Sequence, residues 1–140
     1  MSGSFSEYAA QAVLAHATGK TAWTMPTVYV ALCTVLPTST STGATLTEAT
    51  YTGYARLATS GDWGATVAAT PSTISNSIAL TFAACTAGTS TVVGFALVDS
   101  ATTGAGNVIA WGSCASTVIS TTQTPATFAI GALELTLTAA

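Results

Sequence analysis

Short apolar segments, each interrupted by glycine, proline, serine or threonine, recur along the whole chain and restrict what it can fold into. Residues 78–83 (IALTFA) alternate between large apolar and small or polar side chains. Residues 128–138 (FAIGALELTLT) end in three leucines at every second position, so these leucines would share one face of a strand. Alternation of this period predicts half-buried β-strands.

Two further segments are apolar at nearly every position. They are residues 28–33 (VYVALC) and 92–99 (VVGFALVD), and both are rich in β-branched side chains. Such runs are typical of central strands that are buried on both faces. Residues 100–107 (SATTGAGN) form a flexible turn that joins 92–99 to 108–114, so these two strands are expected to make a hairpin.

The remaining segments carry weaker signals. Residues 54–60 alternate weakly and predict another strand, whereas 118–124 reads as a polar edge or loop that stops at Pro125. Pro71 and Asn76 make the connection around them irregular. Several short strands with turn signals between them predict a mainly β fold, an antiparallel β-sandwich or flattened barrel.

One helix is predicted, near the N-terminus. Ser4 and Glu7 have the spacing of a capping box, and alanine-rich sequence follows. Gly19 stands where a glycine commonly ends a helix, so the helix is expected over residues 5–18. His16 lies in its last turn without a second histidine or an acidic partner at helical spacing, which favours a packing role.

The 140 residues form one domain, 1–140, because the chain is long enough for one core and too short for two. Residues 38–50 (TSTSTGATLTEAT) are rich in turn formers and predict a long extended loop. Loops of this length usually have a function, and we interpret this one, together with the N-terminal residues, as an arm that contacts a partner.

Only 5% of the residues are charged, far below the usual quarter. Soluble monomers rely on surface charge to stay apart, so a surface this poor in charge is expected to be covered by other copies in a homo-oligomer. The two basic residues, Lys20 and Arg56, are too few for binding to nucleic acid or to anionic lipid.

No stretch of about twenty apolar residues is present to span a membrane, and no signal peptide precedes the domain. We therefore expect a protein that is made in a cytoplasm and stays there or is assembled there into a particle. Cys33, Cys85 and Cys114 lie far apart among apolar or small residues, which favours buried free thiols; one disulfide, in any of three pairings, is the alternative.

No set of residues indicates catalysis. A nucleophile–base pair would have to use His16, the one histidine of the chain. The five carboxylates are scattered, at Glu7, Glu48, Asp62, Asp99 and Glu134. No CxxC pair or glycine-rich phosphate loop occurs, so no metal and no cofactor are predicted. The sequence therefore favours a protein that is not an enzyme.

Residues 51–63 (YTGYARLATSGDW) hold most of the candidate contact residues. Arg56 must be exposed or paired, because its guanidinium does not lose its charge, and Glu48 and Asp62 are the plausible partners. Trp63 is expected to anchor the turn that follows Asp62. The structural or contact candidates of the chain are therefore Glu48, Tyr54, Arg56, Asp62 and Trp63.

A set of short motifs recurs in order along the chain. Its residues are Leu32, Cys33, Thr34 and Pro37; Glu48; Gly53, Tyr54, Ala55 and Arg56; Ser75, Asn76, Leu80, Thr81 and Phe82; Gly94, Phe95 and Asp99; Trp111 and Gly112; and Phe128, Gly131, Ala132 and Leu133. This order of motifs resembles a family of small virion structural proteins of tailed bacteriophages, often labelled tail fibre proteins. The resemblance covers nearly the whole chain and departs from the family pattern in the longer 38–50 loop and in the region 62–71.

The resemblance implies a non-enzymatic component of the virion. Within the virion we favour a capsid decoration (cement) protein that binds the assembled head shell and stabilises it, with the major capsid protein and its own copies as partners. One alternative is a tail-tip or fibre-associated subunit that contacts the host and has tail proteins as partners. The other is a carbohydrate-binding β-sandwich, for which Trp63 beside Asp62 is the best candidate, ahead of Trp23; Trp111 is expected in the core.

Overall fold

A computed structural model describes residues 2–24 and 26–138 of the chain. The described residues contain one helix and nine strands. The elements are β1 (Ser2–Phe5), α1 (Glu7–Ala17), β2 (Tyr29–Cys33), β3 (Leu57–Ala58), β4 (Ser72–Ser75), β5 (Leu80–Thr81), β6 (Thr89–Val98), β7 (Val108–Ser120), β8 (Thr127–Phe128) and β9 (Glu134–Leu137). Among them no helix is long and apolar enough to cross a membrane.

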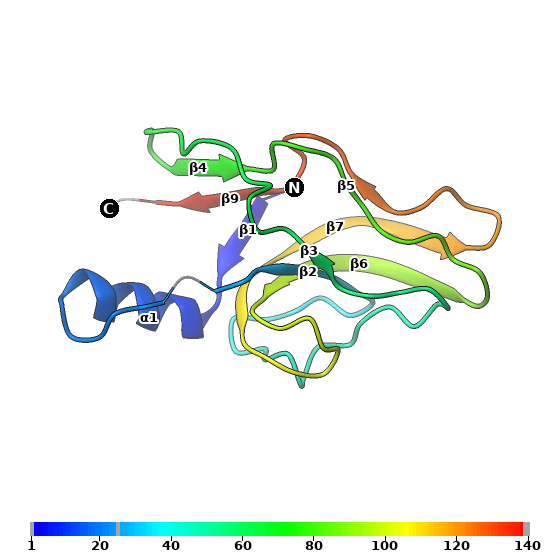
Figure 1. The fold of residues 1–140 in the computed structure, drawn as a ribbon, viewed down its shortest axis with the longest axis horizontal. Coiled ribbons are helices and arrows are strands. Elements are labelled where there is room, and N and C mark those ends of the chain that lie inside the picture. The colour runs from blue at the N-terminus through cyan, green and yellow to red at the C-terminus, as the bar shows by residue number, and fades with distance from the viewer. Residues whose placement is uncertain (1, 25, 139–140) are drawn as a thin grey trace.

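The strands form a curled sheet of seven strands and a small second sheet (Figure 1). The order in the large sheet is β3-β2-β6-β7-β1-β9-β4, and β5 pairs with β8 in the small one. β6 and β7 make the predicted hairpin, which is the longest pairing of the fold, and β2 lies antiparallel to β6. β1 and β9 are parallel neighbours. The predicted mainly β sandwich or flattened barrel is confirmed.

The main core lies between the large sheet and the small one. Phe82, which follows β5, Phe128, from β8, and Phe95, from β6, are buried there and in ring contact. The Phe128 ring centre lies 6.3 Å from that of Phe82 and 5.9 Å from that of Phe95. Tyr54 stacks on Phe82 at 6.4 Å. This aromatic chain joins sequence positions that are more than seventy residues apart.

A second apolar cluster lies on the other face of the large sheet. It consists of Ala31, Cys33, Ala96, Val98 and Val108, with Tyr29, Leu46 and Trp111 packed against it. The central strands β2 and β6 are therefore buried on both faces, as their uninterrupted apolar runs predict.

The N-terminal prediction was partly wrong. The helix starts at Glu7, not at residue 5, because Ser6 caps it: the Ser6 hydroxyl accepts a hydrogen bond from the amide of Ala9 at 3.2 Å. Ser4 does not cap the helix, since it pairs with Trp111 in the sheet. Gly19 has φ of 71° and follows the last turn, as predicted.

Three other elements differ from the prediction. β7 continues to Ser120, through positions predicted as an edge or loop, because β6 supplies a partner along that length. Residues 128–138 are not one strand: β8 and β9 are separated by a turn with Gly131 at φ of 74°. The irregular connection contains β4, which pairs with β9. The strand predicted over 54–60 is reduced to β3.

The 38–50 loop packs on its own domain. Its Gly43 amide donates to the carbonyl oxygen of Gly106 at 2.8 Å, and Glu48 forms a bridge with Cys33 of β2. The N-terminal residues likewise lie inside the large sheet, as β1. Both segments are therefore parts of the domain itself, and their contact with a partner stays a prediction.

The close contact between the 38–50 loop and residues 99–107 predicts a strong effect of one methyl group. A Cβ atom on Gly43 would lie 2.0 Å from the carbonyl oxygen of Ala105, so Gly43→Ala has to move one loop away from the other. We expect a loss of about 1–3 kcal/mol of unfolding free energy, measured by urea denaturation. Gly64→Ala is the matched control, because a Cβ there makes only ordinary contact, 3.4 Å from the carbonyl oxygen of Ser75. Equal stability of the two variants would contradict the loop contact.

Candidate functional site

A buried ion pair connects two of the predicted contact residues. The Arg56 guanidinium Nη2 lies 2.6 Å from Glu48 Oε1, and its Nε donates to both oxygens of the same carboxylate at 3.1 and 3.2 Å. The side chains are 0% and 3% exposed. The pairing is bidentate, the strongest arrangement for these two groups. Of the two carboxylates predicted as partners of Arg56, the structure selects Glu48.

Tyr54 completes this network. Its hydroxyl donates to Glu48 Oε2 at 2.7 Å and accepts from the amide of Leu32 at 3.1 Å. Burial, followed by the hydrogen bond to the Glu48 carboxylate, raises the pKa of Tyr54 well above its ordinary value, so the phenol stays protonated as a donor. Burial and the nearby Glu48 charge also raise the pKa of the Cys33 thiol to about 12, which keeps it from acting as a nucleophile.

Arg56 also holds the loop that connects β6 to β7. Its Nη1 donates to the carbonyl oxygens of Ser100 and Ala105, each at 2.8 Å. Within that loop, Asp99 accepts hydrogen bonds from the backbone amide and the side-chain amide of Asn107, at 2.6 and 2.9 Å. We refer to Glu48, Tyr54 and Arg56 as the clamp, because they connect the 38–50 loop, the 51–56 segment and residues 99–107.

The other two candidates lie outside the clamp. Asp62 is in a turn in which its backbone amide donates to Thr59 and its carbonyl oxygen accepts from the amide and hydroxyl of Ser77. Trp63 forms an isolated bridge with Asn76 and packs against the main core. Trp23 is half-buried and also packs against the main core. Trp111 is half-buried too, but it packs against the second apolar cluster, on the other face of the large sheet. Part of each tryptophan side chain is therefore covered by packing within the domain.

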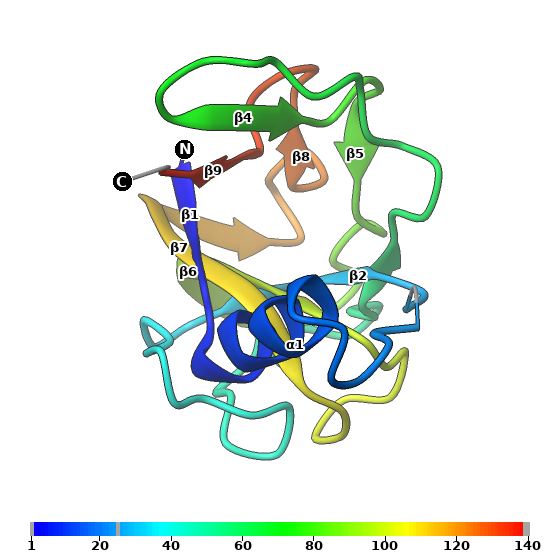
Figure 2. The same ribbon diagram turned by 90° about the vertical axis from the view of Figure 1, so that its left-hand side faces the viewer.

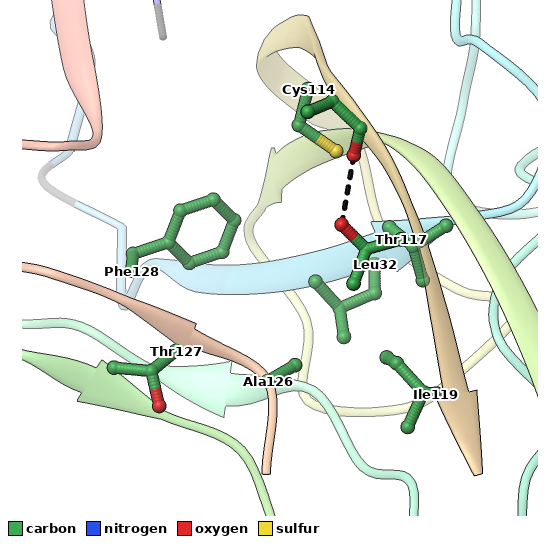
Figure 3. Close-up of a pocket in the computed structure, with 9 residues that line it drawn as sticks. Leu32, Cys114, Thr117, Ile119, Ala126, Thr127 and Phe128 are labelled. Carbon is green, nitrogen blue, oxygen red and sulfur yellow. Dashed lines mark hydrogen bonds between the residues drawn. The ribbon is translucent and has the colours of Figure 1, made fainter. Parts of the chain in front are cut away.

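An apolar cavity of about 280 Å³ opens between β7 and β8 (Figure 3). Leu32 and Val92 come from the central strands, Cys114 to Ile119 from β7, and Phe128 from β8. The lining residues are Leu32, Val92, Cys114, Ala115, Thr117, Ile119, Ala126, Thr127 and Phe128. The Thr117 hydroxyl is already bonded to the carbonyl oxygen of Ala115 at 3.0 Å.

The cavity can hold an apolar group, and its lining includes neither a histidine nor a carboxylate. Cys114 is its one titratable side chain, and burial raises the pKa of that thiol. Among the described residues, no three His, Cys, Asp or Glu side chains are close enough to hold a metal ion. All three cysteines are free, so the alternative of a disulfide was wrong.

Sequence reasoning missed this cavity. It predicted a loop where β7 continues toward Ser120, and it merged β8 with β9 into one strand. No local pattern marks the lining, because the residues come from four segments whose distance from one another is decided only by the packing of the two sheets. The clamp was easier to find, since an arginine in a chain with two basic residues requires a carboxylate.

The family model described as "Podophage GP4 fiber I protein gp80" matches residues 4–136 of the chain. The match therefore includes the clamp, the cavity and both sheets. No curated protein matches the chain.

The clamp predicts a large effect of removing its cation. Arg56→Met leaves the Glu48 carboxylate buried without a counter-charge, and we expect a loss of about 3–5 kcal/mol of unfolding free energy in urea denaturation. The double variant Glu48→Leu, Arg56→Met is expected to be less destabilised than Arg56→Met, since no unpaired charge remains. Lys20→Met, which removes an exposed cation, is the control and should change stability by about 0.5 kcal/mol or less. An Arg56→Met protein as stable as the control would show that the clamp does not hold the loops.

The cavity predicts selective modification of one cysteine. Cys33 and Cys85 are buried, whereas Cys114 is half-exposed at the cavity wall. We expect maleimide to label the native protein once, at Cys114, with a rate that rises about tenfold per pH unit through neutral pH because the raised pKa leaves little thiolate there. Peptide mass spectrometry identifies the site, and Cys114→Ser should abolish labelling of the folded protein. Labelling of Cys33 at a similar rate would contradict its burial.

Proposed function

The chain belongs to the family of podophage GP4 fibre I proteins, and we propose that it is a structural subunit of a phage tail fibre. The observation that carries this proposal is the match over residues 4–136, which covers both sheets and both loops that the clamp connects. A member of this family is a component of the virion, and fibre proteins act through contacts with other molecules. The coarser resemblance to virion structural proteins is thereby confirmed.

The physical properties of the domain support a role in contact. Its strongest polar groups, Glu48 and Arg56, are used to hold its own loops in place. The loops at this end of the molecule are therefore rigid, so a partner can bind them without a large loss of conformational entropy. The surface is poor in charge, which lowers the cost of removing it from water when subunits assemble. We infer a rigid, non-catalytic building unit.

Capsid decoration remains the second candidate, and the shape of the chain favours it. Residues 2–24 and 26–138 form one domain with a curled sheet and without a unit that repeats along an axis (Figure 1), which suits a unit that is added to a shell in many copies. A protein that binds only the assembled shell stabilises that state by its binding free energy, and many weak contacts add up by avidity. In that case the major capsid protein would be its partner; in the fibre it would be other tail proteins.

Fractionation of purified virions separates these two functions. We would separate tail-free heads from isolated tails and measure the protein in each by quantitative mass spectrometry, relative to the major capsid protein and to a known tail protein. The fibre proposal predicts that it follows the tails at a small fixed copy number. Recovery with the heads at near-lattice copy number would overturn the fibre proposal and support decoration. Absence from both fractions would contradict a place in the virion.

A further inference from the structure

The strand β7 has a long edge that no described strand covers. β7 runs from Val108 to Ser120, and β6 pairs with one of its edges along nearly this whole length. On the other edge, β1 pairs only with Ala110 and Trp111. Among the described residues, no strand and no isolated bridge pairs with residues 113–120 on that side. This part of β7 is therefore a free sheet edge.

The free edge presents backbone groups that an added strand can satisfy. In an antiparallel pair only every second residue bonds to the partner strand, so the residues between direct their N–H and C=O groups away from it. Long edges are usually protected by charged residues or proline, and residues 113–120 (SCASTVIS) contain neither. A bulge at residues 114–116, opposite Val93, interrupts the edge. Beyond it, residues 117–120 pair with β6 one to one and form a regular stretch of edge.

The apolar cavity lies directly beside this edge. Cys114 and Ile119 of β7 line one side of it, and Phe128 of β8 lines the other (Figure 3). Among the described strands, β8 pairs with β5 alone. A cavity of about 150 Å³ holds a benzene molecule. The cavity here measures about 280 Å³, so it has room for more than one aliphatic side chain.

A second recess with a more polar lining adjoins the cavity. It measures about 390 Å³, and its lining includes Gln123 and several threonines. Thr117, Ile119, Ala126 and Thr127 line both spaces. Neither lining contains a charged residue. Successive side chains of a strand point to opposite faces, so a segment in which apolar and uncharged polar residues alternate matches this pair of spaces.

We propose that residues 113–120 of β7 bind an extended segment of another protein as an added β-strand. The backbone of that segment pairs with the free edge, and apolar side chains at every second position enter the cavity between β7 and β8. The segment is uncharged where it enters, because the lining offers no group that could pair with a buried charge. The inference goes beyond the proposed function, since it gives the chemistry of a partner and holds equally in a fibre and on a shell.

A different protein is a better source of this segment than a second copy of the chain. Every described strand is already paired in one of the two sheets, and the clamp holds the 38–50 loop and residues 99–107. A second copy would have to open its own sheet to donate one of these segments. A partner with an unpaired extended segment loses only conformational freedom when it binds.

The test uses the full chain and an uncharged peptide of alternating residues, acetyl-Ser-Thr-Val-Thr-Val-Thr-Val-Ser-amide. Titration calorimetry measures its affinity, and maleimide labelling of Cys114 at the cavity wall reports where it binds. We expect saturable binding of one peptide per chain. At a free peptide concentration of about ten times Kd, labelling of Cys114 should slow about tenfold, because only the unbound protein reacts.

Two control peptides test the backbone pairing. One is N-methylated at the valines and the other at the threonines, so both keep their side chains, and each loses the N–H donors of one edge. Whichever row of donors faces β7, we expect one of the two peptides to bind at least about tenfold more weakly than the parent peptide.

A matched pair of variants tests the location. Ala115 is exposed and lines the cavity, so the indole in Ala115→Trp occupies space that the peptide needs, and we expect affinity to fall at least about tenfold. Ala101→Trp, the same change at an exposed position in the loop between β6 and β7, should keep the wild-type affinity. Both variants replace exposed alanines, so each is expected to fold, and circular dichroism checks this.

Absence of peptide binding at millimolar concentration would overturn the proposal, and so would a folded Ala115→Trp protein with full affinity. Equal affinity of the parent and both methylated peptides would show that the cavity takes apolar groups without strand pairing. Protection of Cys114 by a higher concentration of the protein alone would make a second copy the occupant and overturn the choice of a different protein. Because the virion fractionation measures location and the titration measures strand binding, failure of one proposal leaves the other standing.

Discussion

The paired burial of Glu48 and Arg56 is the interaction on which the arrangement of the loops depends. Neither charge can be buried alone, because the desolvation cost of an unpaired ion exceeds what the domain can lose. Once paired, they connect the loop before β3 with the loop between β6 and β7, through the carbonyl oxygens that Arg56 binds. Tyr54 connects the same carboxylate to the amide of Leu32 on β2. The clamp therefore attaches both glycine- and threonine-rich loops to the rest of the domain.

Few charged residues remain in the chain besides those of the clamp. With the clamp neutral inside, the outer surface consists largely of serine, threonine and small apolar side chains. One apolar recess, lined by Phe5, Ala10, Val13, Leu14 and Leu137, lies between α1 and β9, and Figure 2 shows α1 at the front of the molecule. The cavity between β7 and β8 is a separate site. Its lining is largely apolar and contains one half-exposed thiol, that of Cys114.

The elements that sequence reasoning found share one property: their pattern is local. Uninterrupted β-branched runs predicted β2 and β6, and the glycine-rich turn predicted the hairpin of β6 and β7. Arg56 was predicted to need a carboxylate, since its charge is permanent, and Gly19 was placed at the end of the helix. The errors concern segments whose state is decided by a distant partner. β1 is a strand because β7 and β9 lie on either side of it, and β4 exists because β9 pairs with it.

By itself, the sequence determined the class of fold, the single helix and the scarcity of charge. Periodicity and composition indicate which residues can be buried, and both can be read from the sequence without knowing which segments pack together. Only the tertiary structure decided which carboxylate pairs with Arg56, that the 38–50 loop packs on its own domain, and that a cavity opens between β7 and β8. Each of these depends on the distance between segments far apart in the chain. That distance is set when two sheets and a helix pack around one core, because packing selects a single arrangement from many that the local pattern allows.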